Sequence, residues 1–233
     1  MKFASPLIKA RLLRRYKRFL ADVMLESGEE LTVHCPNPGA MAGLKDDGNA
    51  IWISDSGNPA RRLRYTWELV EVDGEIIGVN TNRANTIARD AIAMNLLSNV
   101  GTDPVIKAEQ KYGTNSRIDF LLEDGGPAPV FVEVKNVNFQ RHRGLHEFPD
   151  GVTQRGTKHL NNLIRETKLG SRAMMLFIIQ RNDGDSFAIA EDIDQVYGKT
   201  FHQAIAAGVN VQAICCTVTP EEILPLRSVE ILF

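Results

Sequence analysis

Residues 116–139 read SRIDFLLEDGGPAPVFVEVKNVNF and contain two apolar stretches that are typical of neighbouring β-strands. Asp119 lies at the start of the first stretch, and the triplet Glu133, Val134 and Lys135 lies inside the second. Because side chains alternate between the two faces of a strand, Glu133 and Lys135 are expected on one face and Val134 on the other, in the core. The pattern therefore predicts that Asp119 sits beside Glu133 on an adjacent strand.

This arrangement of charges is typical of a metal-dependent phosphodiesterase site. Two neighbouring carboxylates repel each other unless a cation lies between them, and oxygen ligands suit a hard divalent ion such as Mg²⁺ or Mn²⁺. Such an ion lowers the pKa of bound water and offsets the charge that develops on the phosphodiester. We expect Asp119, Glu133 and the Val134 carbonyl to hold the ion, with Asp90 from a neighbouring helix as a further ligand. Lys135 is expected to contact the scissile phosphate or to orient the attacking water.

The composition limits the classes of partner. The chain has 233 residues, of which 43% are hydrophobic, and this suffices for one large domain or two smaller ones with real cores. The formal net charge of -2 and the sequence pI near 6.2 provide no bulk attraction for polyanions. Any contact with nucleic acid must therefore come from a local basic patch.

One such patch is present near the start of the sequence. Residues 2–20 include seven lysines or arginines and no acidic residue: Lys2, Lys9, Arg11, Arg14, Arg15, Lys17 and Arg18. A charge run of this kind is usually a solvated face. The aromatic residues Tyr16 and Phe19 favour nucleic acid instead, since barrels that bind single strands combine basic grooves with stacking rings. We therefore expect a DNA-binding surface formed by Arg14, Arg15, Tyr16, Lys17 and Arg18.

The cysteines and the hydropathy pattern indicate a cytoplasmic protein with no membrane partner. Cys35, Cys215 and Cys216 fit neither a disulfide framework nor a Cys-x-x-Cys zinc pattern, and the last two lie in an apolar stretch typical of a buried strand. The N-terminal region has no apolar run resembling a signal peptide, and no segment is long enough to span a bilayer.

The chain divides into two regions of different periodicity. Short apolar runs separated by turn residues predict a small closed barrel with strands at 19–25, 31–35, 50–53, 65–72 and 75–79. Helical spacing then predicts helices at 85–97, 155–167 and 192–207. Between and after these helices we expect strands at 105–110, 117–122, 130–137, 173–180 and 209–217. The best boundary lies near residue 80, giving domains 1–80 and 81–233.

The order helix, three strands, helix, strand, helix, strand is that of the restriction-endonuclease-like core. Five motifs strengthen this interpretation: HCPNPGAM at 34–41, NTNRAN at 80–85, SRIDF at 116–120, FVEVKNV at 131–137 and EFPDGVTQRGTKHL at 147–160. In their order and spacing, the chain resembles the sugar fermentation stimulation protein A family over essentially its whole length. A Glu-x-Lys pattern alone would predict only a solvated strand edge.

The resemblance implies an α/β (α+β) protein: a small N-terminal OB-fold β-barrel followed by a restriction-endonuclease-like mixed-sheet domain with flanking helices. It implies Asp119, Glu133 and Lys135 as the catalytic triad of an Asp…Glu-x-Lys site. It also implies DNA binding without sequence preference and a link to the regulation of sugar (maltose) metabolism. The chain departs from the usual nuclease pattern in having Ile118, rather than proline, before the aspartate.

The second helix carries further candidates for nucleic-acid binding. Arg155 and Lys158 lie near its start, where backbone amides also favour anions. His159 is either a phosphate contact or a residue that caps or packs locally.

Two functions are consistent with these features. The first is a non-specific DNA-binding protein with a Mg²⁺- or Mn²⁺-dependent nuclease site. The second is a DNA-binding regulator of sugar metabolism whose nuclease-like domain cuts slowly or not at all. RNA or single strands are alternative ligands, and a homodimer is an alternative to a monomer.

Overall fold

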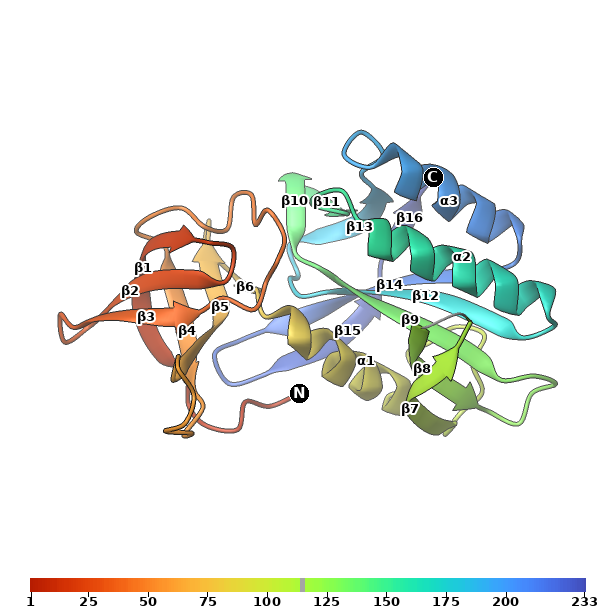
Figure 1. Cartoon of the computed structure of the whole chain (residues 1–233), viewed down its shortest axis with the longest axis horizontal. Coiled ribbons are helices and arrows are strands. Elements are labelled where there is room, and N and C mark those ends of the chain that lie inside the picture. Colours follow the sequence, from red (N-terminus) through yellow and green to blue (C-terminus); the bar gives the residue numbers. More distant parts are fainter. Residues whose placement is uncertain (114–115) are drawn as a thin grey trace.

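The first part of the computed structural model, which describes residues 1–113 and 116–233, is a small β-barrel (Figure 1). Its strands follow the order β3-β2-β1-β4-β5-β6, and a parallel pairing of His34 with Thr66 joins β3 to β5 and closes it. The strands are β1 (Ile8–Tyr16), β2 (Leu20–Leu25), β3 (Glu30–His34), β4 (Ala50–Asp55), β5 (Tyr65–Val72) and β6 (Glu75–Gly78). The predicted OB-like barrel is confirmed, as are its five expected strands.

Strand β1 is an addition to the expected set. Its sequence, IKARLLRRY, places Ala10 and Leu12 in the barrel core while lysine and arginine occupy most other positions. The basic run is thus one strand of the barrel, followed by a tight turn in which Lys17 and Arg18 adopt positive φ. The high density of charge hides the two core positions from a search for apolar runs.

The second part is a six-stranded mixed sheet with helices on both faces. Its order is β15-β14-β12-β9-β8-β7, in which β9, β12 and β14 are parallel. The strands are β7 (Val105–Tyr112), β8 (Ser116–Glu123), β9 (Val130–Val137), β12 (Arg172–Ile179), β14 (Asn210–Val218) and β15 (Ile223–Ser228). Helix α1 (Ala84–Ala93) covers one face, whereas α2 (Gln154–Lys168) and α3 (Gln195–Ala206) cover the other (Figure 1). The predicted fold class and helix order are confirmed.

A second, four-stranded sheet was not predicted. It has the order β10-β11-β13-β16, with strands β10 (Phe139–His142), β11 (Gly144–Phe148), β13 (Gly184–Ile189) and β16 (Glu230–Leu232). These strands are short and mixed in polarity, and β11, β13 and β16 pair in parallel across large sequence separations. Local periodicity carries little signal for such pairs, because their partners lie far away in the chain.

The ends of the helices follow from local chemistry. Helix α1 ends at Ala93, four residues before the predicted end, because Asn95 adopts a positive φ of 55°. Helix α2 begins after Thr153, whose hydroxyl accepts from the Gly156 amide at 3.1 Å. Asp194 caps α3 by accepting from the Tyr197 amide, and its second oxygen accepts from the Thr153 amide at 2.8 Å. The N-termini of the two helices are therefore fixed to each other.

The segment 80–85 joins the barrel to the mixed sheet. Glu68 of β5, which is buried, accepts from Arg83 at 2.6 and 3.0 Å and from Asn80 at 2.8 Å. The Asn80 carbonyl in turn accepts from Gln180 at the end of β12. A side chain at Gly78 would collide with Gln180, since a Cβ there would lie 2.2 Å from Oε1. This short junction sets where α1 begins relative to the barrel.

The helices are too short or too polar for a membrane. None within the described ranges, 1–113 and 116–233, is long and apolar enough to cross a bilayer.

Buried histidine should make the fold sensitive to acid. His146 on β11 is completely buried, and burial followed by the charge of Arg181 lowers its pKa, with Asp183 opposing and Arg227 adding to the effect. The unfolded chain therefore binds more protons than the folded one below about pH 6.5, so stability is full above that pH and falls as the pH drops.

We expect the unfolding free energy to decline between pH 7 and pH 5, with His146 contributing up to about 1.4 kcal/mol per pH unit. Replacing His146 with leucine should flatten this decline in urea titrations performed across the range. An unchanged pH dependence in His146→Leu would contradict the assignment.

Candidate metal centre

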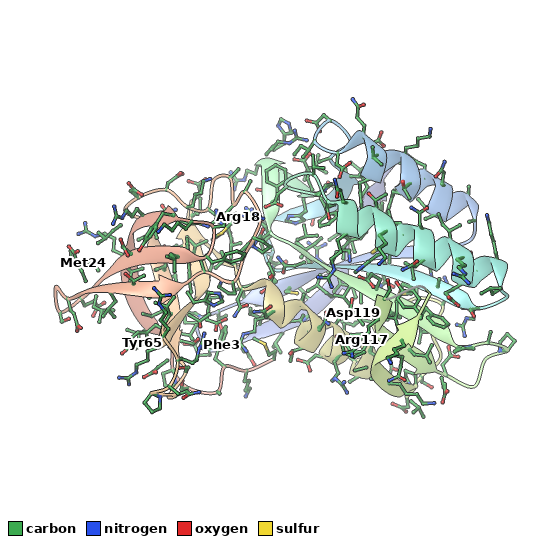
Figure 2. All side chains as sticks on the ribbon, in the orientation of Figure 1. Phe3, Arg18, Met24, Tyr65, Arg117 and Asp119 are labelled. Atoms are coloured by element: carbon green, nitrogen blue, oxygen red, sulfur yellow. The ribbon has the colours of Figure 1, made fainter. Side chains whose placement is uncertain are left out.

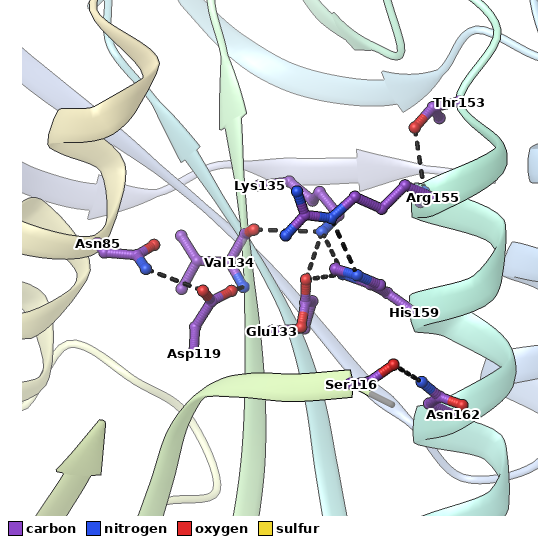
Figure 3. A network of polar contacts seen from close by, with 11 residues as sticks. Asn85, Ser116, Asp119, Glu133, Val134, Lys135, Thr153, Arg155, His159 and Asn162 are labelled. Carbon is purple, nitrogen blue, oxygen red and sulfur yellow. Dashed lines mark hydrogen bonds and ion pairs between the residues drawn. The ribbon is translucent and has the colours of Figure 1, made fainter. Parts of the chain in front are cut away.

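The centre lies where strands β8 and β9 separate. Their paired register runs from Leu122 and Val130 to Phe120 and Val132. One residue further along β8, the Asp119 carboxylate replaces the backbone partner, and its Oδ2 accepts from the Val134 amide at 2.8 Å (Figure 3). The predicted proximity of Asp119 to the Glu133 strand is thus present, through a side chain inserted between two diverging strands.

Asp119 is half-buried against the sheet and held at both oxygens. Its Oδ1 accepts from the Asn85 amide of α1 at 2.8 Å. Burial raises the pKa of Asp119, and the negative charge of Glu133 raises it further, against the bonds from Val134 and Asn85. An ion that neutralised both carboxylates would relieve this unfavourable placement of charge.

Glu133 lies on the opposite face from Val134, as alternation predicted. Its Oε1 accepts from Lys135 Nζ at 2.6 Å and is also bonded to His159 Nδ1 of α2 (Figure 3). Burial acts to raise the pKa of Glu133, but Lys135 and His159 outweigh it, so the pKa falls below its usual value. Glu133 is 2% exposed, and its Oε2 has no hydrogen-bond partner among residues 1–113 and 116–233.

The available ligands fit a hard divalent ion. A buried carboxylate oxygen without a donor is unfavourable, and Glu133 Oε2 becomes satisfied if it coordinates a cation. The Val134 carbonyl receives a long contact of 3.4 Å from Lys135 Nζ. Two carboxylates and a carbonyl are oxygen ligands of the kind that Mg²⁺ and Mn²⁺ prefer. Within the described ranges no three His, Cys, Asp or Glu side chains gather as a metal cluster, so the set contains two carboxylates.

Asp90 does not join this set, which corrects its assignment as a metal ligand. Its carboxylate pairs with the Met1 ammonium at 2.5 Å. Asn85 is the α1 residue that contacts Asp119. Asp90 lies five residues further along the helix, which corresponds to a rotation of about 140° about the helix axis, so the two side chains point in different directions. Asn85 lies in the NTNRAN motif, but the sequence did not predict it as part of the centre, because a side-chain amide is a weaker indication of a metal site than a carboxylate.

The helix α2 candidates occupy different places. His159, 8% exposed, lies inside the centre, with Nδ1 at Glu133 and Nε2 accepting from Arg155 Nε at 3.4 Å. Both ring nitrogens are thus engaged within the protein, and this favours the local-packing alternative over a direct phosphate contact. Arg155 extends from the exposed surface over the centre (Figure 3). Lys158 lies on the exposed face of α2.

The basic residues of the barrel are partly committed to structure. Arg15 Nη2 donates to the carbonyls of Asn37 at 2.8 Å and Gly39 at 3.0 Å, and therefore supports the loop that carries the HCPNPGAM motif. Arg18 Nη2 donates to the Pro38 carbonyl at 3.0 Å and lies on the barrel, well apart from Asp119 (Figure 2).

Of the other three predicted DNA-binding residues, Arg14 and Tyr16 already have hydrogen-bond partners for their side chains, whereas the Lys17 side chain has none among the described residues. Asp22 accepts from Arg14 at 2.8 Å and from the Tyr16 hydroxyl at 3.0 Å. The Lys17 carbonyl accepts from the Phe19 amide at 2.7 Å, but its side chain, at the tip of the turn, has no hydrogen bond or ion pair with any residue that the structure describes. The structure therefore brings these side chains to one surface, but only Lys17 and the exposed part of Arg18 are uncommitted.

Together, a small OB-like barrel and a mixed sheet with an Asp…Glu-x-Lys arrangement define a two-module protein of the restriction-endonuclease-like class. Residues 13–79 match the profile of the SfsA N-terminal OB domain, and residues 82–222 match that of the sugar fermentation stimulation protein RE domain. The chain belongs to the sugar fermentation stimulation protein (SfsA) family.

Related proteins cover the chain from end to end. It is 50% identical over 230 residues to a sugar fermentation stimulation protein homolog of Maricaulis maris, covering 97% of this chain and 98% of that protein. It is 46% identical over 233 residues to the homolog of a Chelativorans species, covering 100% of both. The structure of Pyrococcus furiosus SfsA in complex with Ca²⁺ matches with a TM-score of 0.87 and 24% identity, covering 100% of this chain and 98% of that one. The last comparison shows a shared fold.

Removing the charge of Asp119 should stabilise the ion-free protein. Asparagine keeps an oxygen for the Val134 amide, and the Asn85 amide can reverse to accept from the new NH₂ group. Because burial raises the pKa of Asp119, the charged form is disfavoured in the folded state, and Asp119→Asn relieves that penalty. We expect a higher Tm for Asp119→Asn in a chelator, by roughly 2–4 °C for each kcal/mol gained.

Manganese should reverse the ranking of the two proteins. The wild type gains about 2.7 kcal/mol when the ion is present at a hundred times its Kd, and Asp119→Asn should gain much less. Scanning calorimetry with and without Mn²⁺ measures both effects. A lower Tm for Asp119→Asn in chelator would show that its carboxylate stabilises the ion-free fold.

Proposed function

We propose that this chain is a divalent-metal-dependent nuclease that binds nucleic acid without sequence preference. The observation that carries the proposal is the pair of carboxylates, the half-buried Asp119 and the buried Glu133, on diverging strands beside Lys135, with Glu133 Oε2 unsatisfied by the described residues. The ion is Mg²⁺ or Mn²⁺, held by Asp119, Glu133 and the Val134 carbonyl. A related SfsA has been solved in complex with Ca²⁺, another hard divalent ion, and this supports the choice of ion class.

Each residue has a defined task in this scheme. When bound, the divalent ion supplies an acidified water and offsets negative charge on the phosphodiester. Asn85 fixes the orientation of Asp119 through its 2.8 Å bond. Lys135 Nζ, 2.6 Å from Glu133 Oε1, holds a positive charge at the place where the scissile phosphate arrives. Arg155 offers its terminal nitrogens to the same phosphate.

In this proposal the barrel binds the nucleic acid. In this division, residues 1–80 hold nucleic acid and residues 81–233 carry the chemistry. A groove of about 430 Å³ lies between them, lined from the barrel by Arg18 and Asn37 and from the mixed-sheet domain by Asn136 and Thr153. Its walls provide amides, hydroxyls and one guanidinium that can bond to a sugar-phosphate backbone, together with the carboxylates of Glu147 and Asp150, which the phosphates must avoid. We take DNA as the ligand, with RNA as an arm of the test.

Two observations favour a second function. The described residues bring only two carboxylates to the centre. The relatives of this chain carry names that refer to sugar fermentation. A DNA-binding regulator of sugar (maltose) metabolism with slow or absent cleavage would need the same grip and a weaker centre. The two functions differ in turnover, so a cleavage assay separates them.

The decisive experiment measures cleavage and binding in parallel. Labelled single- and double-stranded DNA and RNA are incubated with the wild type, with and without Mn²⁺, and the same substrates are offered to Lys135→Ala. Because Lys135 acts mainly on charge that develops during reaction, we expect a loss on the order of a hundredfold to a thousandfold in rate. Binding should weaken by no more than one phosphate contact.

Lys199→Ala, on the exposed face of α3, is the matched control for removal of a lysine. If the wild type cuts and Lys135→Ala cuts equally fast, the assignment of the triad is wrong. If neither protein cuts any substrate while both bind DNA, the regulator becomes the better description.

The barrel surface should give a salt-dependent contribution. Replacing Lys17 and Arg18 with alanine removes two phosphate contacts, so the slope of log affinity against log salt should flatten by roughly two. Fluorescence anisotropy with a labelled oligonucleotide at several salt concentrations measures the slope. The double variant Lys168→Ala, Lys199→Ala removes two exposed lysines from the helices and serves as the control. Equal slopes in wild type and the barrel variant would exclude this turn from the interface.

A further inference from the structure

His159 occupies a central position between the metal ligands and the outer surface. It lies one helical turn after Arg155, so the two side chains share a face of α2. Its ring is nearly buried, with Nδ1 bonded to Glu133 Oε1 and Nε2 accepting from Arg155 Nε at 3.4 Å. The imidazole is therefore a link between a carboxylate inside the centre and a guanidinium outside it (Figure 3).

The partners assign the tautomer of the ring. Arg155 has only donors, so Nε2 must be the bare, accepting nitrogen. The proton then sits on Nδ1 and is donated to Glu133 Oε1. Lys135 Nζ, 3.2 Å from Nδ1, is also a donor and cannot bond to it, so the lysine donates to Glu133 instead. Two donors therefore converge on Glu133 Oε1.

We propose that His159 is a positioning residue that couples the two sides of the centre, by orienting Glu133 toward the ion and Arg155 toward the phosphate. The inference rests on the proposed function, because it assigns His159 a task at that same centre. In this role His159 does not contact the phosphate itself but acts on it through Arg155.

The effect on Glu133 follows from the division of its two oxygens. With Oε1 held by His159 and Lys135, the carboxylate cannot rotate freely, and Oε2 is the oxygen left without a partner among the described residues. A ligand whose outer partner fixes its orientation binds an ion more tightly. Loss of such a partner typically weakens metal affinity by about 10- to 100-fold.

The effect on Arg155 follows from the shape of the guanidinium. Arg155 is exposed, and a long side chain on a surface samples many rotamers. The bond from Nε to His159 fixes the plane of the group and leaves the two terminal NH₂ groups free of that contact. A planar fork of this kind is suited to paired bonds with a phosphate.

The backbone under His159 is held in place independently of the site. Thr153 caps α2, and Asp194 accepts from the Thr153 amide at 2.8 Å. Gly156 packs against α3 so closely that a Cβ there would lie 3.0 Å from Tyr197 Cε2. A side chain that starts from a fixed helix turn can act as a precise spacer between two functional groups.

Two isosteric substitutions divide the two tasks. In His159→Asn, the amide nitrogen takes the place of Nδ1 and keeps the donor to Glu133, while the acceptor for Arg155 is lost. In His159→Gln, the longer side chain places an amide oxygen near the position of Nε2 and keeps that acceptor, while the donor to Glu133 is lost. Mn²⁺ affinity is measured by calorimetry, and affinity for a labelled oligonucleotide is measured by anisotropy in chelator.

We expect opposite patterns. His159→Gln should bind Mn²⁺ about tenfold or more weakly and bind the oligonucleotide as the wild type does. His159→Asn should bind Mn²⁺ as the wild type does and lose the same oligonucleotide affinity as Arg155→Ala, which sets the scale for that contact. Thermal unfolding of each variant checks that the fold is retained.

The outcomes separate this inference from the proposed function. If the wild type binds no Mn²⁺, both the metal centre and the positioning of Glu133 are overturned. If the wild type binds Mn²⁺ and the two variants lose affinity equally, or neither loses any, the centre stands and the coupling by His159 is overturned. Should His159→Gln fail to fold, the comparison of His159→Asn with Arg155→Ala still decides the phosphate side.

Discussion

The hydrogen bond from the Val134 amide to the Asp119 carboxylate is the contact around which the candidate centre is built. An amide that would otherwise extend the β8–β9 ladder bonds to a side chain, and the paired register ends two residues before it on β9, where Val132 pairs with Phe120. The separated strands admit Asp119 between α1 and the sheet. The Val134 carbonyl and the Glu133 carboxylate then lie beside it, on a rigid strand that is paired along its other edge with β12. Precise placement of this kind is more easily achieved on strands than on loops.

The centre combines two carboxylates that the fold treats differently. Lys135 and His159 lower the pKa of Glu133 against the effect of burial, whereas burial and the charge of Glu133 raise the pKa of Asp119 against its bonds from two neutral amides. The imbalance leaves negative charge in a buried place, and that is a typical compromise between stability and function. Another buried carboxylate of the same fold is fully satisfied, since Glu68 is bonded to Arg83, Asn80 and Ser54. Only the candidate centre retains an unsatisfied carboxylate oxygen in the part of the chain that the structure describes.

Local periodicity predicted much of this architecture. Alternation placed Glu133 and Lys135 together and Val134 in the core, and helical spacing located all three helices, because those patterns are set by near neighbours in the chain. The sheet formed by β10, β11, β13 and β16 was missed because its parallel pairs join distant segments. Asp90 was predicted at the centre, but Asn85 is the α1 residue found there. The difference arises because the rotation of a helix about its axis depends on packing rather than on residue type. Arg15 could not be recognised as a support for the 37–39 loop, since a guanidinium bonded to carbonyls has the same sequence signature as one that binds phosphate.

The junction at residues 80–85 has a mechanical consequence. Asn80 and Arg83 are anchored to the barrel through Glu68, Asn80 also accepts from Gln180 of the sheet domain, and Asn85 reaches Asp119. Anchors this closely spaced make the segment a rigid connection rather than a hinge. A nucleic-acid strand bound by the barrel would then always lie at the same distance from the two carboxylates, so the position of any cut would be counted from the point where the barrel holds the strand.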